Sequence, residues 1–560
     1  VWKKGHWCPV FKHSNTQDKK NYRPVSLLPC ISKVMEKIVF NEMYNYLSNN
    51  NLLYERNSGF KLLDSTVNQL VYIVDFLYKH LEEGEDICMV FLDVSKAFDK
   101  VDHEGLLLKV KSLGINANLL QWLESYLADR QQRVVINGVC SEWKPVRAGV
   151  PQGSVLGPLL FLIYVNDIAK DIESLIQLFA DDTSLMEVIN KACPQITFDK
   201  IERDLDRLSR WAEQWRVTFN ELKTVYMIIS KKRDKIQYPE ISFNNVVIQK
   251  VSSHTHLGLT LNETLTWDDH FNRVVPKANK RINCLRRIRD LVPRSTLETL
   301  YKSMIRPILE YGCVIFDNIN AKQSIRLESI QRSAAIICTG AMKLTNSDNL
   351  LRELGWDTLQ QRRKFYRMTL MYKMNNNLVP AYLYALLPDT VQERTEGSYA
   401  LRNQTNLSLV RCKRDYYAKS FLPLSVKEWN QLSNDICNVQ TLSTFKIKYK
   451  KEFLSKKNKL FSISFNSAHK FHTRLRLNCS QLQQHLFTFN LVDSPLCIFC
   501  SMKDETIYHY FLECPTFSVH RTLLLSTLVT VIPMEILAGL DEVSLLQIIL
   551  FGSEQLDFVK

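Results

Sequence analysis

The sequence predicts a mixed α+β fold that alternates strands and helices up to about residue 262 and then continues as a mainly helical region. Two apolar runs, at residues 87–92 and 176–179, indicate buried strands, and each is followed directly or closely by aspartate. Beyond Trp267, apolar residues recur at helical spacing instead. With 46% hydrophobic residues, the chain has enough apolar surface for packed cores.

Length and charge limit the class of protein. A chain of 560 residues is typical of about three to four domains. The net charge of +14 and pI near 9.0 favour a polyanionic partner, nucleic acid before a membrane surface, although a merely soluble basic protein is the alternative. Fourteen unevenly spaced cysteines without a signal peptide favour reduced thiols over a secreted disulfide scaffold. Pro533 and Asp541 interrupt the apolar stretch at 523–551 below the ~20 residues of a membrane span, so we expect packed helices there.

The first elements are expected to be helices, because residues 22–81 show helical periodicity. Val34 and Ile38 belong to one apolar face, and Val71 and Val74 to another. This stretch precedes the first predicted strand and would cover one side of the sheet region.

Residues 87–262 alternate between strand and helix patterns. Ile201, Leu205 and Leu208 mark an amphipathic helix. The Asn244-Asn245 pair between two short apolar runs predicts a β-hairpin. The expected elements are a strand at 87–93, helices within 104–128, a strand at 133–137, a helix after Pro158, strands on both sides of Asp181, a helix over 198–215 and a hairpin at 241–248.

The second half begins with a basic amphipathic helix. Val274, Ala278 and Ile282 form its apolar face. The opposite face carries Arg273, Lys277, Lys280, Arg281 and Arg287. Such a face contacts nucleic-acid phosphates or is merely solvated. Residues 300–445 continue the helical pattern without assignable chemistry, and the basic segment at 446–459 is either a linker or an exposed helix end.

The most informative residues are Asp181 and Asp182, which follow an apolar strand. An acidic pair there is unfavourable unless a cation lies against it, and carboxylate oxygens suit Mg²⁺ or Mn²⁺. Asp93 ends the other apolar strand, and the long stretch between them allows a crossover that places the two strands side by side. The glycine-containing loop at 149–158 leaves backbone open to a flat or phosphorylated ligand. Two-metal phosphoryl chemistry requires these features together.

The order of motifs resembles the reverse transcriptase of a non-LTR retrotransposon, of the jockey-like or LINE-like kind. Asn-Tyr-Arg-Pro-Val-Ser-Leu-Leu at 21–28 resembles the opening finger motif, and Gly59-Phe60-Lys61 with Ser65-Thr66 the next one. Residues 93–99, 149–158 and 179–182 resemble motifs A, B and C. Motif D is represented by Trp211, Trp215, Phe219, Asn220, Lys223 and Thr224, and motif E by His256-Leu257-Gly258.

This resemblance implies a right-hand polymerase fold. Fingers and palm would occupy residues 1–262, a helical thumb and connecting region 263–460, and a C-terminal zinc-knuckle-like module with a helical tail 461–560. The activity implied is an RNA-directed DNA polymerase that extends a DNA 3′-end on an RNA template, using deoxynucleoside triphosphates and Mg²⁺ or Mn²⁺. It implies an intracellular ribonucleoprotein, nuclear or cytoplasmic, without a membrane. Because Val1 is not preceded by methionine, we expect a fragment, and the resemblance implies a missing upstream endonuclease domain.

The resemblance also assigns the metal site. Asp93 and Asp181 would hold two Mg²⁺ ions about 3.5–4 Å apart, one activating the primer 3′-hydroxyl and one neutralising pyrophosphate. Successive strand residues point to opposite faces, so Asp182 can join them only in a tight turn, and we expect Asp181 to be the stronger ligand. Asp99 and Asp102 lie past the strand end, and helix capping is their expected role.

Five residues resemble the nucleotide-binding set of the family. Phe98 resembles the bulky residue beneath the incoming sugar, where a ring excludes a 2′-hydroxyl and selects deoxynucleotides; core packing is the alternative. Gln152 and Gly153 resemble residues that touch the incoming nucleotide and the template base. Lys61, where the family usually has arginine, would contact the template or the triphosphate. Lys223 resembles the motif D lysine that protonates pyrophosphate, although it is also consistent with a solvated surface lysine.

A second metal site is predicted near the C-terminus. Cys497-x2-Cys500-x8-His509-x4-Cys514 offers four ligands of the type that Zn²⁺ binds in a tetrahedron. Buried free cysteines in a helical tail are the alternative, and Cys479 or His520 are less favoured ligands. Such a module would hold the element's RNA or its target DNA.

Other functional interpretations are weaker. A catalytically inactive retrotransposon relic would act only as a nucleic-acid-binding protein, but the three intact aspartates argue against it. A group II intron maturase or an RNA-templated RNA polymerase is disfavoured by Phe98 and by the C-terminal cysteine motif.

Overall fold

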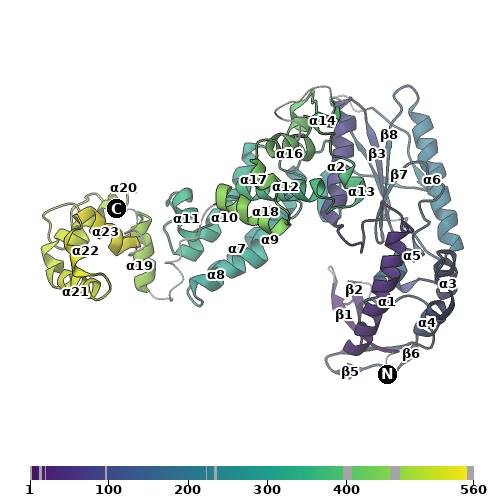
Figure 1. Cartoon of the computed structure of the whole chain (residues 1–560), viewed down its shortest axis with the longest axis horizontal. Coiled ribbons are helices and arrows are strands. Elements are labelled where there is room, and N and C mark those ends of the chain that lie inside the picture. Colours follow the sequence, from purple (N-terminus) through teal and green to yellow (C-terminus); the bar gives the residue numbers. More distant parts are fainter. Residues whose placement is uncertain are drawn as a thin grey trace. The chain divides into compact units, whose positions relative to one another are not determined.

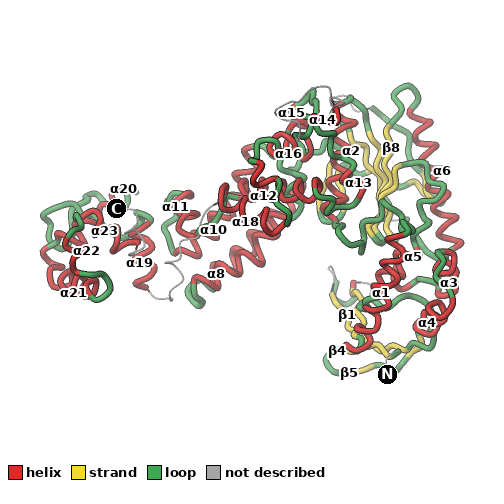
Figure 2. Tube along the Cα trace, viewed as in Figure 1, coloured by secondary structure: helices red, strands yellow, loops and turns green. Residues whose placement is uncertain are grey.

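The chain forms two compact units. The computed structural model describes residues 3–11, 15–18, 21–94, 97–221, 223–232, 236–394, 406–454 and 467–551. Unit 1 comprises Val1–Asp269, Ile315–Asn318 and Leu370–Gln431, and unit 2 comprises His270–Val314, Ile319–Thr369 and Leu432–Lys560. Unit 1 mixes strands with helices, whereas unit 2 is helical, so the predicted α+β class is confirmed (Figures 1 and 2).

A five-stranded sheet is the centre of unit 1. Its order is β12 (Gln249–Lys250), β9 (Val225–Ile229), β3 (Ile87–Asp93), β8 (Asp182–Val188) and β7 (Leu175–Phe179). The predicted crossover is present, because β3 lies directly beside β8 and runs antiparallel to it. The two acid-terminated runs of the sequence therefore belong to one sheet.

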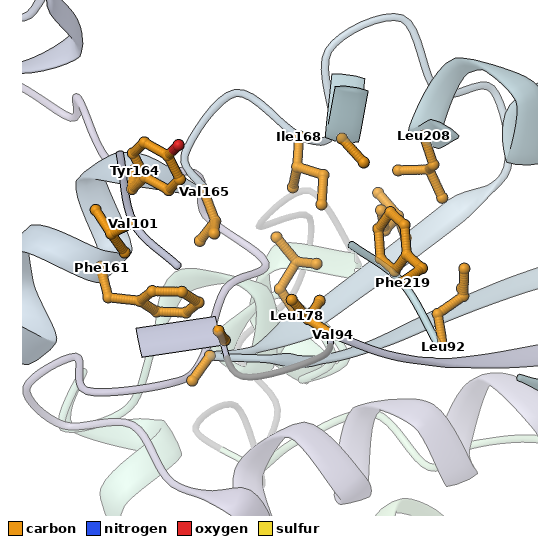
Figure 3. Close-up of a cluster of buried hydrophobic side chains, with 14 of the residues drawn as sticks. Leu92, Val94, Val101, Phe161, Tyr164, Val165, Ile168, Leu178, Leu208 and Phe219 are labelled. Carbon is orange, nitrogen blue, oxygen red and sulfur yellow. The ribbon is translucent and has the colours of Figure 1, made fainter. Parts of the chain in front are cut away.

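One face of this sheet covers the main core. Because strand residues alternate, Cys88, Val90 and Leu92 point to one side and pack with Leu178 and Leu185. The helices over this face are α3 (His103–Ser112), α4 (Ala117–Leu127), α5 (Gly157–Tyr164) and α6 (Pro194–Gln214). Figure 3 shows Leu92, Leu178 and Phe219 in this core, with Phe161 beside them.

The other face of the sheet is covered by α2 (Thr66–Glu82) and by a hairpin of β13 (Ser253–His256) and β14 (Leu259–Asn262). The Phe91 ring stacks on His254 with 4.1 Å between ring centroids. Burial and, to a smaller extent, the charge of His254 together lower the pKa of His256 to about 3, so His256 is neutral at physiological pH. The sheet is thus buried on both faces, which fixes where its strand ends lie.

A second sheet forms from the N-terminal segment. The strand β1 (Lys4–Phe11) pairs antiparallel with β2 (Tyr22–Leu27) and parallel with β4 (Gln131–Ile136), and β4 also pairs with β5 (Val139–Cys140) and β6 (Lys144–Pro145). The predicted helical stretch from residue 22 is therefore wrong at its start. Pro24 disfavours a helix interior, and pairing with β1 satisfies the backbone of β2 instead.

Helix α1 (Cys30–Asn49) buries a different face from the one that its apolar residues suggest. Val34 and Ile38 are 58% and 62% exposed, whereas Glu36 is only 2% exposed. Glu36 Oε2 accepts hydrogen bonds from the backbone N–H groups of Val155 (2.7 Å) and Leu156 (3.2 Å). These N–H groups lie at the start of α5 and have no partner within that helix, so the carboxylate determines how α1 is oriented.

Residues 370–431 fold onto unit 1, although the sequence grouped them with the region 263–460. Their helices are α13 (Ala381–Tyr384), α14 (Val391–Arg394), α15 (Asp415–Ala418) and α16 (Phe421–Trp429). Buried Glu82 at the end of α2 accepts hydrogen bonds from the backbone N–H groups of Lys413 and Arg414, the latter at 3.0 Å. The Tyr416 hydroxyl donates to the carbonyl of Leu81 at 2.8 Å.

The smaller elements follow the sequence closely. The hairpin of β10 (Ser242–Phe243) and β11 (Val246–Val247) turns at Asn244 and Asn245, whose φ angles are 51° and 61°. Asparagine tolerates this left-handed region better than most residues, so the predicted turn is confirmed.

Unit 2 is helical in its described part. Helix α7 (Asp268–Arg287) begins at the end of unit 1 and buries Val274, Ala278 and Ile282, as predicted. The helices that follow are α8 (Arg294–Leu300), α9 (Arg306–Glu310), α10 (Ala321–Thr339), α11 (Ser347–Leu354), α12 (Leu359–Asn375, which ends in unit 1), α17 (Asn434–Cys437), α18 (Leu442–Phe453), α19 (Ser467–Arg476), α20 (Gln483–Thr488), α21 (Ser518–Val529), α22 (Met534–Ala538) and α23 (Glu542–Phe551).

A buried ion cluster joins three segments of unit 2. Glu353 Oε1 contacts Arg294 Nη1 at 2.9 Å and Arg476 Nη2 at 2.7 Å, and the Arg476 side chain is only 1% exposed.

Within the described residues, the chain contains no helix with the length and apolar character that crossing a membrane requires.

Candidate functional site

The acidic pair lies in a tight hairpin. In the β7–β8 register Phe179 faces Asp182, so Ala180 and Asp181 form a two-residue turn. Ala180 has a φ of 57°, which is the left-handed conformation that such turns require. Asp182 in turn lies opposite Asp93 in the β3–β8 register. The tight turn that would allow both members of the pair to share one site is therefore present.

The three carboxylates repel one another. Partial burial and, after it, the charges of Asp181 and Asp93 together raise the pKa of Asp182 from 3.8 to about 6. The Asp182 side chain nevertheless remains accessible to solvent at the surface. Like charges that raise a pKa in this way are relieved by a cation, and hard carboxylate oxygens are the donors that Mg²⁺ or Mn²⁺ prefers. The donor set fits such an ion.

Lys223 is held beside Asp93 by the segment that precedes it. The Asn220 N–H donates to the Asp93 carbonyl at 2.9 Å, and the Lys223 N–H donates to the Asn220 carbonyl at 3.0 Å. Phe219 also forms a β-bridge with Val94. The Lys223 ammonium then lies 3.0 Å from Asp93 Oδ2, while 67% of its side chain remains exposed. A surface cation is thus directed at one of the carboxylates.

Phe98 packs against the main core. It lies in the 3₁₀ turn η2 (Ala97–Asp99), and its ring stacks on Phe161 with 4.6 Å between centroids. The edge of Phe60 approaches it with a centroid distance of 5.9 Å. The ring is only half-buried. It therefore packs on the core with one side and leaves the other available to a ligand.

The loop of motif B is fixed against its neighbours by backbone contacts. Ser26 N–H donates to the Gln152 carbonyl at 2.6 Å, and Val150 N–H donates to the Phe98 carbonyl at 2.8 Å. Gly153 has a φ of 121°, and a Cβ atom there would lie 2.5 Å from the Ser26 carbonyl oxygen. Only glycine fits this position.

The two aspartates beyond motif A behave differently from each other. Asp102 Oδ2 accepts from the Gly105 N–H at 2.9 Å at the start of α3, so its predicted capping role is confirmed. Asp99 lies within η2, and its Oδ1 accepts from Gln152 Nε2 at 3.0 Å. For Asp99 the structure shows a contact that joins motif A to motif B, and its capping role stays a prediction.

Lys61 is anchored to its own loop. Its Nζ donates to the Tyr54 carbonyl at 2.5 Å, and burial lowers the pKa of the ammonium to about 8. The group is therefore still charged at neutral pH. Its predicted contact with the template or the triphosphate stays a prediction.

Sequence reasoning missed the loop that supports the acidic turn. Asn57 Oδ1 accepts from the N–H groups of Gly59 at 3.2 Å and Ala180 at 3.5 Å. A Cβ atom on Gly59 would lie 2.4 Å from the Ala180 backbone nitrogen. The loop therefore presses directly on the turn that carries Asp181. The Gly59-Phe60-Lys61 motif marks this loop in the sequence, but nothing there indicates its contact with residue 180.

Tyr382 on α13 also stabilises the loop that contains Asn57 and Gly59. Its hydroxyl donates to Asp64 Oδ1 at 2.8 Å and accepts from Ser58 Oγ at 3.0 Å. The Ser58 N–H in turn donates to the Leu178 carbonyl at 2.8 Å, one strand residue before Phe179. Tyr382 is distant in the sequence and lies in a stretch without a motif, so no sequence signal identifies it.

The cysteine-histidine cluster in unit 2 is assembled as predicted. The ligand atoms of Cys497, Cys500, His509 and Cys514 all lie within 4.8 Å of one another. Cys500 Sγ is 3.2 Å from His509 Nε2, and Cys497 Sγ is 4.0 Å from Cys514 Sγ. The cluster does not include Cys479 or His520. Three thiols and an imidazole form the donor set that tetrahedral Zn²⁺ prefers.

Backbone contacts hold the four ligands in place. The Ser501 N–H donates to the Cys497 carbonyl at 2.8 Å, which closes the turn between the first two cysteines. The Cys514 N–H donates to the His509 carbonyl at 2.7 Å across the π-helical turn η5 (His509–Glu513). A backbone N–H of Met502 lowers the pKa of Cys500 to about 7, which favours the thiolate that a metal binds.

The basic residues of α7 lie on the outside of their helix. Arg273, Lys277, Lys280 and Arg287 are exposed, and Arg281 is half-buried. The basic face predicted from the sequence is thus accessible to a polyanion.

Comparison with known proteins identifies the region that contains the three aspartates. Residues 9–261 match the family described as reverse transcriptase (RNA-dependent DNA polymerase). The RNA-directed DNA polymerase from mobile element jockey of Drosophila melanogaster is 28% identical over 390 residues, which cover 67% of this chain and 42% of that protein. The probable RNA-directed DNA polymerase from transposon X-element of the same species is 30% identical over 367 residues, 64% of this chain and 40% of that one.

The chain thus spans about two fifths of the length of these curated relatives. Among solved structures, apo telomerase from Candida Tropicalis aligns with a TM-score of 0.38 and 13% identity, covering 68% of this chain and 63% of that one. No conclusion rests on this last likeness. The predicted resemblance to non-LTR retrotransposon reverse transcriptases is confirmed by the sequence relatives.

Replacing Tyr382 by Phe is expected to loosen the acidic turn. Loss of its two hydrogen bonds, of about 1 kcal/mol each, should make local opening, and hence amide hydrogen exchange over residues 178–182, about 30-fold faster. Hydrogen-exchange mass spectrometry measures this. Tyr384→Phe, which removes an exposed hydroxyl from the same helix, is the matched control. Equal exchange in both variants would contradict the supporting role of Tyr382.

Replacing Asp182 by Asn is expected to stabilise the metal-free protein near pH 7.5. The folded environment disfavours the ionised carboxylate, and its removal should raise the free energy of unfolding by about 1 kcal/mol after allowance for solvent screening. Because the folded pKa is about 6 and the reference value is 3.8, the wild type regains this stability on protonation as pH falls through that interval.

Urea unfolding in EDTA between about pH 4 and 8 tests the pH dependence. The difference between Asp182→Asn and wild type should vanish at the acidic end. Asp206→Asn on the exposed face of α6 should show no such trend. A stabilisation that is independent of pH would mean that ionisation of Asp182 is not its cause.

Proposed function

We propose that this chain, in which residues 9–261 form a reverse transcriptase domain, is an RNA-directed DNA polymerase of a non-LTR retrotransposon that extends a DNA 3′-end on an RNA template. The observation that carries the proposal is the convergence of Asp93, Asp181 and Asp182 at one end of the central sheet. The similarity to jockey and X-element polymerases supports the same activity.

In this proposal the central sheet with its covering helices is the palm of a right-hand polymerase. The β1–β2–β4 sheet with α1 would form fingers, and the helices that begin with α7 would form the thumb. The basic face of α7 supports a phosphate-binding role, because Arg273, Lys277, Lys280, Arg281 and Arg287 lie along one helix. The chain would act within an intracellular ribonucleoprotein, in the nucleus or the cytoplasm.

The carboxylates would hold two divalent ions, Mg²⁺ or Mn²⁺. When bound, these ions would stabilise the charge that develops on the attacking and leaving oxygens of nucleotidyl transfer. Asp93 and Asp181 would be the principal ligands, with Asp182 in support. The raised pKa of Asp182 supports this assignment, because burial and the neighbouring charges of Asp181 and Asp93 both disfavour its ionised form, and a bound cation would offset them.

Lys223 would act as a general acid. Its ammonium can transfer a proton to the leaving pyrophosphate oxygen, which lowers the basicity of the leaving group. The contact with Asp93 supports this role, because it holds the ammonium at the edge of the carboxylate cluster. The exposed side chain can leave Asp93 and reach a phosphate oxygen.

Deoxynucleoside triphosphates would be the substrates. The half-exposed ring of Phe98, supported from behind by Phe161, would lie against the 2′ position of the sugar and exclude a hydroxyl there. Gln152 and Gly153 would contact the incoming nucleotide and the template base. Lys61 would contact the template or the triphosphate, and its charge at neutral pH supports this.

The C-terminal cluster would bind one Zn²⁺ ion through Cys497, Cys500, His509 and Cys514. The buried thiols, the lowered pKa of Cys500 and the spacing of the four ligand atoms support zinc over hard cations. When bound, zinc would stabilise a small nucleic-acid-binding module by joining its two ends. The module would hold the element's RNA or the target DNA.

Replacing Asp181 by Ala is expected to abolish DNA synthesis. A radiolabelled DNA primer annealed to an RNA template should be extended by the wild type with deoxynucleotides and Mg²⁺, and at least about 100-fold less with ribonucleotides. The variant should lose at least about 1,000-fold in rate. Asp206→Asn is the control, because its charge lies on α6 away from the sheet end.

Two outcomes would decide against the proposal. Extension that survives in the Asp181→Ala variant would remove the catalytic assignment. A wild-type protein that binds the primer–template but adds no nucleotide would favour the alternative, a retrotransposon relic that acts only by binding nucleic acid.

Replacing Cys500 by Ser is expected to reduce zinc binding. The wild-type chain should contain about one zinc equivalent after dialysis, and the variant well below half of that, because a hydroxyl is a poor ligand for Zn²⁺. Inductively coupled plasma mass spectrometry measures the content. Cys140→Ser, which alters an exposed thiol of β5, should leave it unchanged. Unchanged zinc in the Cys500 variant would exclude Cys500 as a ligand.

A further inference from the structure

Unit 1 contains a cavity of about 90 Å³ where the β1–β2–β4 sheet meets the loop of motif B. Trp7 of β1, Ser26 of β2 and Gln132 of β4 line it on the sheet side. Arg130 and Gln152 complete the wall. Neither Asp93 nor either member of the Asp181-Asp182 pair lines this cavity, so it is distinct from the carboxylate site.

Arg130 is an unusual member of this lining. Arg130 is only 5% exposed, and its Nη1 donates to the Tyr126 carbonyl at 3.2 Å. The guanidinium carbon lies 4.9 Å from the centroid of the Tyr126 ring. The Val146 N–H donates to the Arg130 carbonyl at 2.8 Å, which fixes the backbone. The side chain is thus held in one place from three directions.

This buried cation has no acidic partner in the described part of the chain. No carboxylate there lies within ion-pair distance of Arg130, whereas buried Arg294 and Arg476 of unit 2 both pair with Glu353. A guanidinium carries five N–H donors, and the Tyr126 carbonyl uses one. Burying an unpaired charge is costly, so the remaining donors of Arg130 suit an anion from outside the chain.

The walls of the cavity indicate which anion fits. Asp99 also lines it, but its Oδ1 accepts from Gln152 Nε2 and so is already engaged. Trp7 is half-buried and lines the same cavity, and the ring of Tyr126 lies against the guanidinium. A buried arginine next to an aromatic ring suits the phosphate and sugar of a nucleic-acid strand, because each contributes a separate part of the contact.

The position of the cavity distinguishes the template from the other substrates. The triphosphate and the primer 3′-end must both reach the metals at Asp93 and Asp181. The cavity lies instead behind motif B, whose Val150 N–H bonds to the Phe98 carbonyl. It therefore shares Gln152 with the proposed nucleotide site but contains none of the three aspartates. The template strand is copied but does not itself react at the metals. It is therefore the strand for which a phosphate contact at this cavity is useful.

We propose that Arg130 binds a phosphodiester of the template strand at this cavity and thereby fixes the register of the template base over Gln152. The inference rests on the proposed polymerase function. An arginine–phosphate contact is charge-assisted and position-specific, so Arg130 is a positioning residue that determines template affinity rather than the chemical step.

Neutral linkages in the template test this without altering the protein. RNA templates carry one 2′-O-methyl methylphosphonate linkage at each of about six successive positions 5′ to the templating base, and 2′-O-methyl phosphodiesters are the matched controls. With wild-type protein, one position should weaken equilibrium template binding and raise the template KM about tenfold, while kcat changes less than about twofold.

Variants then assign that position to Arg130. Arg130→Met should weaken binding of the unmodified template about tenfold and be insensitive to the neutral linkage at the critical position. Arg130→Lys should recover part of the affinity because it restores the charge. Arg147→Met removes an exposed cation that lies between the cavity-lining residues Val146 and Ala148. This variant should stay sensitive to that linkage.

Two results would overturn the inference. In one, wild-type binding is indifferent to the neutral linkage at every position. In the other, Arg130→Met keeps the wild-type sensitivity at the critical position. The binding measurement needs no catalysis. Failure of wild-type extension alone would therefore count against the polymerase proposal, while template binding by the Arg130 variants could still be compared.

Discussion

The register between β3 and β8 is the constraint on which the functional site depends. It places Asp182 opposite Asp93 and leaves Asp181 in the two-residue turn, so three negative charges share one sheet end. Burial of Asp182 and repulsion among the three charges both oppose folding, as the raised pKa of Asp182 indicates. The surrounding structure offsets this cost. Both faces of the sheet are buried, and the loop of Asn57 and Gly59 presses on the turn from outside. A slip of one residue in the register would turn Asp182 to the other face of the sheet and separate it from Asp93.

Local patterns predicted the elements that carry the site, and long-range contacts account for what they missed. The strands around Asp93 and Asp181 and the Asn244-Asn245 hairpin follow from residues close in sequence. In contrast, the parallel pairing of β1 with β4 joins distant segments, and the strand β2 was mistaken for helix. Val34 and Ile38 have a helical period, but Glu36 determines which face of α1 is buried. The contact of Tyr382 with Ser58 and Asp64 has no sequence signature, because a tyrosine hydroxyl is as compatible with the surface as with a buried network.

The cations of unit 1 show that environment, rather than residue type, determines what a basic side chain can do. Lys223 is exposed and paired with Asp93, so it can exchange one oxygen for another at little cost. Lys61 is anchored to a carbonyl, and burial brings its pKa to about 8, so its charge is sensitive to what binds nearby. Arg130 is buried with a carbonyl and a ring but no described carboxylate, and arginine cannot relieve the cost by losing its proton. In the proposed functions, these three situations would suit a mobile acid, a responsive contact and a fixed anion receptor.

The two proposed metal sites differ in how the chain builds them. Cys497, Cys500, His509 and Cys514 lie in one short segment, and backbone hydrogen bonds within that segment bring their donor atoms within 4.8 Å. Completing this site then requires only a zinc ion, and its coordination would itself contribute to the free energy of folding. The carboxylate site instead depends on strands that are far apart in sequence and on a support that includes α13. Packing between these distant segments creates its geometry. Mutations far from the aspartates should therefore affect the carboxylate site more readily than the zinc cluster, in which the ligands and their supporting contacts share one local segment.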